Sequence, residues 1–241
     1  MFSRSRLDIH EHLFTHLTLP SVECQIDREG VLDFSFMVLT SEVLPEPYLG
    51  NLHRLAEERP WMDVVELPAF VNQPFAGLGA MIEQRCTSSR YVTVRLDDDD
   101  VLSGDYMDGL QKHLDLPWRD YAVSFPRGFC GFYGRRGFSE FRKFNKPKLA
   151  LGLATVHDLK PARNGSRRIR YVYDFGRHAR LDEKLPVILN GSFPAYLRTI
   201  HSQSDRFRVA MRQARRRMRV GLEQVREQVE VPSEFLARRF K

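Results

Sequence analysis

Four consecutive aspartates, Asp97–Asp100, directly follow the apolar segment YVTVRL at residues 91–96. Carboxylates placed side by side repel one another, and two unit charges about 6 Å apart cost roughly 0.7 kcal/mol even in water. A divalent cation offsets this repulsion, because Mg²⁺ accepts carboxylate oxygens as ligands together with phosphate oxygens of a bound molecule. The cluster therefore predicts a site for a metal ion and a phosphate-bearing ligand.

Two other interpretations of the cluster are weaker. A calcium loop of the EF-hand type needs glycine at its sixth position and glutamate at its twelfth. Counting from Asp97 places Leu102 and Asp108 at those positions, so the pattern fails. A solvated acidic turn stays open as an alternative, although the apolar segment immediately before the aspartates disfavours it.

The aspartates lie at the end of one of several short apolar segments that alternate with amphipathic ones. β-Branched and aromatic residues predict strands, and apolar residues at helical spacing predict helices. The predicted strands are residues 31–40, 62–68 and 91–96, and the predicted helices are residues 5–25, 45–60, 75–86 and a helix that begins at Ser103. This alternation is typical of a three-layer α/β/α fold with a mostly parallel sheet, in which ligands bind at the carboxyl ends of strands.

The second half of the chain has a different pattern. Strand-like segments at 121–125, 128–134 and 168–175 are separated by glycine, proline and basic residues. The sequence GRRG at 134–137 predicts a hairpin turn. Residues 193–203 predict a helix, because their apolar residues fit helical spacing.

The last segment predicts one long amphipathic helix that ends near Val231-Pro232. Its apolar positions recur every three or four residues: Phe207, Met211, Ala214, Met218, Leu222, Val225 and Val229. We therefore expect residues 1–204 to form one domain and residues 205–241 to form a basic amphipathic helical tail.

The net charge of +6 is concentrated in the second half, and residues 205–219 carry seven arginines and one aspartate. This basic face has three interpretations: a solvated face above a packed apolar stripe, a contact with an anionic membrane surface, or a contact with nucleic acid. Nucleic acid is the least favoured, because the chain shows no other nucleic-acid motif and the acidic cluster repels phosphates unless metal is bound.

Cysteine usage and the first residues predict the compartment. The three cysteines are widely spaced, which is typical of reduced thiols. No apolar run approaches the ~18–20 residues needed to cross a bilayer, and the first residues do not resemble a secretory signal. We expect a cytoplasmic protein, held peripherally at the inner face of the membrane if the basic face binds lipid.

At this point the sequence resembles a known family. The segment RLDDDD followed by DYMDGL looks like the Asp-x-Asp region of nucleotide-sugar glycosyltransferases with the GT-A fold. More narrowly, the chain is similar to the bacterial putative rhamnosyltransferase family. The segments that carry this resemblance are TLPSVECQ (18–25), FSFMVLTSEVLPEPYLGNLHRL (34–55), SFPRGF (124–129), LATVHD (153–158) and FPAYLRTIH (193–201). It covers most of residues 7–202 and fails in the arginine-rich tail.

The resemblance implies transfer of a sugar from a nucleotide diphosphate, dTDP-rhamnose among the candidates, to a hydroxyl of a glycan or lipid-linked acceptor. Such an enzyme would help build a bacterial surface polysaccharide. It also implies a divalent metal, Mn²⁺ or Mg²⁺. By this resemblance, Asp97 and Asp99 match the two metal-binding aspartates of the Asp-x-Asp motif. Asp98 and Asp100 have the same spacing and match the motif equally well. His201 is the candidate that completes the metal shell, and His157 is its rival.

For the donor-binding and catalytic roles, the sequence offers several candidate residues each. The candidates for donor contacts are Arg95, Asp98, Asp100, Thr40, Ser41 and Glu42. An inverting reaction needs a carboxylate that accepts the acceptor's proton. Asp158, Glu140 and Asp174 are the candidates, and the sequence does not choose among them.

One feature departs from the family pattern. A GT-A domain opens with a strand ahead of its first helix, whereas this sequence begins in the segment that predicts that helix. We therefore expect the first strand to be missing or to come from elsewhere in the chain, which puts nucleotide binding in doubt. The alternatives to an enzyme are a catalytically impaired GT-A-like binding module and a membrane or nucleic-acid adaptor that acts through the basic tail.

Overall fold

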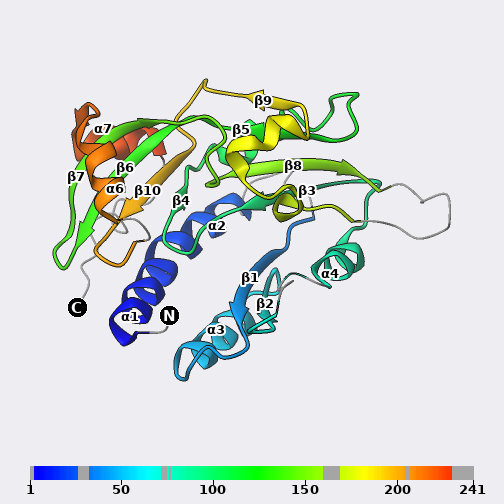
Figure 1. Cartoon of the computed structure of the whole chain (residues 1–241), viewed down its shortest axis with the longest axis horizontal. Helices are drawn as coiled ribbons and strands as arrows, with labels where there is room; N and C mark the ends of the chain where they lie inside the picture. Colours follow the sequence, from blue (N-terminus) through cyan, green and yellow to red (C-terminus); the bar gives the residue numbers. More distant parts are fainter. Residues whose placement is uncertain are drawn as a thin grey trace.

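The computed structural model of the chain describes residues 3–26, 33–71, 75, 77–159, 169–204 and 207–229. These residues form a mixed α/β structure with three sheets of two, four and five strands. Figure 1 shows the first helices lying between the two-stranded sheet and the five-stranded sheet. The α/β class predicted from the alternating segments is thus confirmed.

The predicted helix at 5–25 is present as one continuous element. It consists of α1 (Arg4–Leu13), one π-helical turn (Phe14–Thr18) and α2 (Leu19–Ile26). Pro20 lacks a backbone N–H, and its ring crowds the preceding turn of a regular helix. The wider π-helical turn immediately before α2 accommodates the proline without ending the helix.

The alternation of strands and helices in the first half is confirmed. The elements in chain order are β1 (Phe36–Ser41), α3 (Tyr48–Glu57), β2 (Met62–Leu67), α4 (Leu78–Arg85) and β3 (Arg90–Arg95). β1 and β2 are parallel, in a register that runs from Phe36 opposite Met62 to Ser41 opposite Leu67. Residues 31–32 and 76 of the predicted elements lie outside the described residues.

The prediction of a mostly parallel sheet is wrong, because the pairing is mixed. β3 pairs in antiparallel fashion with β8 (Leu153–Asp158), and β8 does so with β5 (Tyr121–Ser124). β5 then pairs in parallel with β9 (Val187–Leu189). β8 follows neither β3 nor β5 directly in the chain, so its antiparallel pairing with both depends on tertiary packing that short-range patterns do not reveal.

The five-stranded sheet has the order β11-β7-β6-β10-β4. Its strands are β4 (Val101–Leu102), β6 (Arg127–Gly134), β7 (Gly137–Asn145), β10 (Tyr196–Ile200) and β11 (Arg219–Val220). The predicted GRRG hairpin turn is confirmed, since Gly134 pairs with Gly137 where β6 turns into β7.

The predicted helix at 193–203 is wrong, because residues 196–200 form β10. This strand is parallel to β6 on one side and antiparallel to β4 on the other. Its successive residues Tyr196 and Leu197 are both completely buried, and they belong to two different hydrophobic clusters. Apolar residues on both faces suit a central strand, whereas spacing alone did not distinguish it from a buried helix.

Two further predictions need correction. The strand expected at 168–175 is not formed, because Val172–Phe175 is a 3₁₀ helix, capped by the Asp174 side chain, and residue 168 lies outside the described part. A second 3₁₀ helix spans His178–Glu183. The helix expected from Ser103 is the shorter α5 (Tyr106–Gln111) with Asp105 at its N-cap, because Ser103 directly follows β4 and donates its backbone N–H to the carbonyl of Ala195, which directly precedes β10.

The prediction of one long amphipathic helix at the end of the chain is also wrong. α6 (Phe207–Arg215) and α7 (Leu222–Val229) are separated by β11, which pairs with β7. The free edge of β7 offers main-chain hydrogen bonds, and the Lys143 N–H donates to the Met218 carbonyl at 3.0 Å. Met218 is therefore 60% exposed, whereas Val225 is buried in the core. Residues 205–206 and 230–241 of the predicted tail lie outside the described residues.

The close contact between β6 and β10 can be tested at Gly128. A Cβ placed there would lie 2.6 Å from the Tyr196 backbone oxygen, which cannot move without breaking the sheet. We expect Gly128→Ala to lower the free energy of unfolding by about 1–3 kcal/mol in urea titrations. Gly134→Ala in the same strand is the control, since no described atom lies within 4 Å of that Cβ. Equal stability of both variants would contradict this strand pairing.

Candidate functional site

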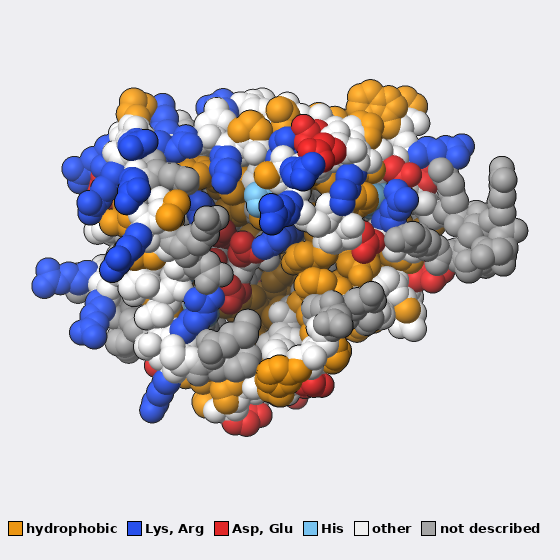
Figure 2. Space-filling view, viewed as in Figure 1, with side chains coloured by type: hydrophobic (Ala, Val, Ile, Leu, Met, Phe, Trp, Pro, Cys, Tyr) orange, Lys and Arg blue, Asp and Glu red, His pale blue; other side chains and the backbone are white. Residues whose placement is uncertain are grey.

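A large cleft of about 1490 Å³ lies between β1 and β3, bordered by the first helix and α4. Figure 2 shows this hollow near the centre of the molecule, with acidic side chains on one side and hydrophobic side chains on the other. The Asp97–Asp100 cluster lines the cleft at the carboxyl end of β3. The acidic residues therefore lie at a cavity, not on an open surface.

The four aspartates form a tight turn. The Asp100 N–H donates to the Asp97 carbonyl at 3.3 Å, and the Thr18 hydroxyl donates to the Asp98 carbonyl at 3.0 Å. Thr18 belongs to the π-helical turn, so the first helix fixes the backbone of the acidic turn.

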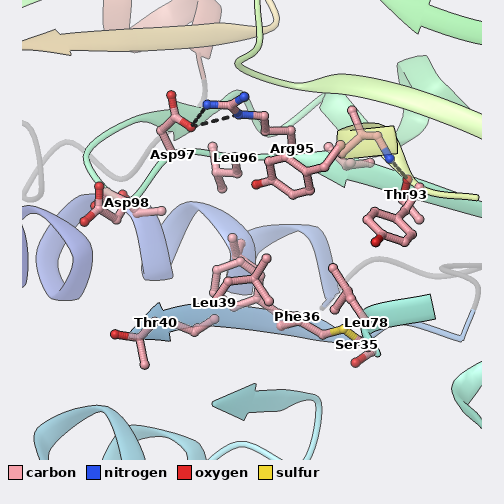
Figure 3. A pocket seen from close by; sticks show the side chains of 18 of the residues that line it. Ser35, Phe36, Leu39, Thr40, Leu78, Thr93, Arg95, Leu96, Asp97 and Asp98 are labelled. Carbon is pink, nitrogen blue, oxygen red and sulfur yellow. Dashed lines mark hydrogen bonds and ion pairs between the residues drawn. The ribbon is translucent and has the colours of Figure 1, made fainter. Parts of the chain in front are cut away.

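Asp97 is held by the last residue of β3. Two nitrogens of the Arg95 guanidinium, Nε and Nη2, lie 3.1 Å from the Asp97 Oδ1, as Figure 3 shows. The guanidinium also lies 5.3 Å from the centre of the Tyr173 ring. Burial raises the pKa of Asp97 above its usual range; Arg95 opposes this rise, and the neighbouring Asp99 adds to it.

Asp98 is paired with a residue from the first helix. His10 Nδ1 lies 2.9 Å from Asp98 Oδ2, and the Asp98 side chain is 58% exposed. Burial alone would lower the pKa of His10, but the hydrogen bond to Asp98 and the charges of Asp98 and Asp99 raise it overall. This part of the site therefore attracts positive charge.

Asp99 is paired with a residue from β10's end. His201 Nε2 lies 2.9 Å from Asp99 Oδ2, and the His201 side chain is completely buried. The backbone N–H of His201 donates to the Ser204 hydroxyl at 3.0 Å, which fixes the chain where it leaves the sheet.

His10, Asp99 and His201 together form a set that fits a metal ion. Each can offer one ligand atom, and these atoms all lie within 4.8 Å of one another. Within the described part of the chain, His10 Nε2 and His201 Nδ1 are buried and have no hydrogen-bond partner. Buried polar atoms are normally satisfied, so these two nitrogens call for a partner, and imidazole and carboxylate groups are common ligands of divalent cations.

Asp100 has a different environment from the other three aspartates. It is 4% exposed, and its Oδ1 accepts a hydrogen bond from the Thr199 N–H at 2.8 Å. Burial raises the pKa of Asp100 well above its usual range, and the charges of Asp99 and Asp97 add to the rise. This carboxyl group ties the acidic turn to β10.

The predicted loop residues divide into two groups. Thr40 and Ser41 line the cleft, and Figure 3 shows Thr40 at the same end of the cleft as Asp97 and Asp98. Glu42 is not among the lining residues, and its carboxylate accepts a hydrogen bond from the Ala69 N–H at 2.9 Å.

None of the three candidates for a catalytic base is among the residues that line the cleft. Asp158 accepts a hydrogen bond from Arg90 at 2.8 Å, and Glu140 is paired with Arg142. Asp174 accepts a hydrogen bond from the Tyr171 N–H at 3.3 Å.

His157, the rival metal ligand, is likewise separate from Asp99. Its Nδ1 lies 2.8 Å from Asp120 Oδ1, and its ring stacks on Phe175. It is a buried core histidine with a carboxylate partner.

Sequence reasoning missed His10 as a site residue. Its signal was present, because a histidine occupies a position in the apolar stripe of the first helix. Arg198 in β10 also lines the cleft and was missed, since residues 193–203 were predicted to be helical.

The structure is that of a mixed α/β protein with an acidic turn at a large cleft and a neighbouring set of residues that could hold a metal ion. A family model described as "Putative rhamnosyl transferase" matches residues 1–213. The chain belongs to this family, as its resemblance predicted, and the match reaches into α6, beyond the expected limit of residue 202. A search of curated proteins found no match. Among the described helices, none has the length and apolar character needed to cross a membrane.

The anchoring role of Asp100 can be tested by substitution. Asp100→Ala leaves the buried Thr199 N–H without its acceptor, so we expect the free energy of unfolding to fall by about 1–3 kcal/mol. Asp100→Asn keeps an acceptor oxygen and should lose less. The exposed Asp98→Ala serves as the control for removing one acidic charge from the cluster. Urea titrations measure all three, and equal losses in Asp98→Ala and Asp100→Ala would contradict the assignment.

Proposed function

We propose that the protein is a glycosyltransferase that moves a sugar, rhamnose by the family's description, from a nucleotide diphosphate to an acceptor hydroxyl. The observation that carries this proposal is the cluster of His10, Asp99 and His201 beside the end of β3, in which His10 and Asp99 line the cleft and His201 is buried next to Asp99. In this proposal β3 and the acidic turn serve as the Asp-x-Asp region of a GT-A-like fold.

His10, Asp99 and His201 would hold a divalent cation, Mn²⁺ or Mg²⁺. A cation there offsets the negative charge that grows on the diphosphate leaving group, as a Lewis acid and a template. The mixed set of two imidazoles and one carboxylate suits Mn²⁺ better than Mg²⁺, since Mg²⁺ prefers oxygen ligands.

The remaining cleft residues would position the donor. Arg95 holds Asp97 at the end of β3, and its charge is available to a phosphate oxygen on the same side. Thr40 and Ser41 present hydroxyl groups on the opposite side of the cleft, where a ribose or base would lie. The choice of catalytic base among Asp158, Glu140 and Asp174 stays a prediction.

The metal proposal can be tested with purified protein by calorimetric titration with Mn²⁺. We expect Asp99→Asn and His201→Gln to weaken Mn²⁺ binding by at least about tenfold, because each removes a ligand. The control is His53→Gln, since His53 lies on α3, is paired with Glu66 of β2 and lies outside the set of three. Unchanged Mn²⁺ affinity in Asp99→Asn would contradict the assignment.

The donor class is tested separately. Thermal-shift measurements with dTDP-rhamnose, dTDP and UDP-glucose, each with and without Mn²⁺, report binding to the native state by mass action. We expect stabilisation that depends on Mn²⁺ and is lost in Asp99→Asn. Stabilisation by none of these nucleotides would favour the alternative of an impaired binding module.

We further propose that the basic surface of α6 lies against an anionic membrane that holds the acceptor. Arg208, Arg212, Arg215 and Arg216 surround a surface hollow together with Phe207 and Met211. Figure 2 shows lysine and arginine side chains gathered at the end of the molecule that contains α6 and α7. Basic residues beside apolar ones are typical of surfaces that bind anionic lipid.

Membrane binding is tested by sedimentation with phosphatidylserine vesicles. Each arginine near such a surface contributes about 1 kcal/mol, so Arg208→Ala with Arg212→Ala should weaken binding by about 30-fold. The matched control is Arg135→Ala with Arg136→Ala, which removes two exposed arginines from the β6–β7 turn. Equal weakening in both double variants would show a general charge effect and would contradict a role for α6.

A further inference from the structure

Arg198 in β10 differs from the other arginines that line the described part of the cleft. These arginines are Arg6, Arg85, Arg90, Arg95 and Arg198. The first four donate to a carboxylate or a backbone carbonyl, in turn that of Gln203, Asp63, Asp158 and Asp97. Within the described residues, the half-buried Arg198 forms neither a hydrogen bond nor an ion pair. Arginine side chains withdrawn from water are normally paired, so Arg198 is available to a ligand.

The acidic turn does not supply the missing partner. Asp100 is close enough to Arg198 to feel its charge: burial raises the pKa of Asp100, and the charge of Arg198 opposes part of this rise. The Oδ1 of Asp100 nevertheless accepts the Thr199 N–H at 2.8 Å. The other three aspartates are paired with other side chains. Arg198 therefore brings a positive charge to this end of the cleft that the turn does not use.

The surroundings of Arg198 add more positive charge. Its guanidinium lies 5.8 Å from the centre of the Phe144 ring, and the Arg217 guanidinium lies 4.5 Å from the same centre. Burial raises the pKa of the nearby Cys130 thiol to about 11, and the charges of Arg198, Arg217 and Arg142 oppose this rise. Several guanidinium groups gathered in one region create a potential that attracts anions.

β10 separates Arg198 from the proposed metal ligands. Side chains alternate between the two faces of a strand, and Arg198 lies near Phe144 on the face that α6 covers. Leu197 belongs to the cluster on the other face, together with residues of the first helix. The His201 ring also lies on that side, 5.2 Å from the ring of His10. An anion bound by Arg198 would therefore lie across β10 from a diphosphate held through a metal at these histidines.

We propose that Arg198 binds a phosphate group of the acceptor, so that the molecule that receives the sugar is itself phosphate-bearing. A planar guanidinium donates two parallel hydrogen bonds to phosphate oxygens. α6 packs on the same face of the sheet and exposes four further arginines, which continue the positive surface toward the proposed membrane contact. The acceptor role rests on the proposed function, whereas the phosphate site rests on Arg198 and its surroundings.

Phosphate binding is tested by calorimetric titration of the full chain with glycerol 3-phosphate in the absence of metal. We expect Arg198→Gln to weaken binding at least about tenfold, because it removes a charged donor. Arg198→Lys keeps the charge without the planar fork and should lose less. The matched control is Arg219→Gln, which removes an arginine that is 72% exposed from the same sheet and should leave the affinity unchanged. Melting temperatures of all three variants show whether each one folds.

The two possible sources of a phosphate, donor and acceptor, are separated by repeating the titration with saturating Mn²⁺ and dTDP. Equal affinity for glycerol 3-phosphate in both conditions supports the proposal, because the phosphate then has a site of its own. Competition with dTDP would assign Arg198 to the donor and overturn the proposal.

Three further results would overturn it as well: no binding of glycerol 3-phosphate to the unaltered chain, unchanged affinity in Arg198→Gln, or equal weakening in Arg219→Gln. The dTDP titration reports on the donor site by itself. If dTDP does not bind while glycerol 3-phosphate binds through Arg198, the proposed function fails and the phosphate site stands.

Discussion

The crowding of four negative side chains at the end of β3 is the constraint on which the site depends. Each aspartate has a different partner. Asp97 pairs with Arg95, Asp98 with His10, Asp99 with His201, and Asp100 with the Thr199 N–H. Because the partners come from the first helix, β3 and the β10 region, these elements must meet at one point for the turn to be stable.

This requirement explains features of the fold that would otherwise be unrelated. The π-helical turn brings Thr18 to the backbone of the acidic turn, while Pro20 continues the helix behind it. β10 lies between β6 and β4, which delivers Thr199 and His201 to the turn from the other side. The same packing brings His10, Asp99 and His201 together in a set that could hold a metal ion.

The acidic turn is accessible because β1 and β3 are separated by a cleft. Because no described strand joins them, a large cleft reaches from the acidic turn along both strand edges. The acidic turn lies at one end of that cleft, and apolar residues of both strands line the space between them. In the proposed function, the phosphate-bearing ligand would lie at the charged end.

The local pattern of the first half was predicted well because it depends on short-range periodicity. The helix at 5–25, the hairpin turn at 134–137 and the strand before Asp97 follow from residue types a few positions apart. The prediction failed where tertiary pairing outweighs local preference. Residues 196–200 fit helical spacing, but two neighbouring strands bury both of their faces. Arg219 and Val220 interrupt the terminal helix because β7 offers them hydrogen bonds.

The sequence by itself determined the acidic turn, its place after an apolar strand and the family to which the chain belongs. Only the tertiary structure decided which aspartate takes which partner, because His10 and His201 are far apart in the chain and approach Asp99 through packing. It also decided that Asp100 is an anchor, since burial and a backbone donor, not residue type, distinguish it from its neighbours. Four identical residues in a row carry no local signal that could separate these roles.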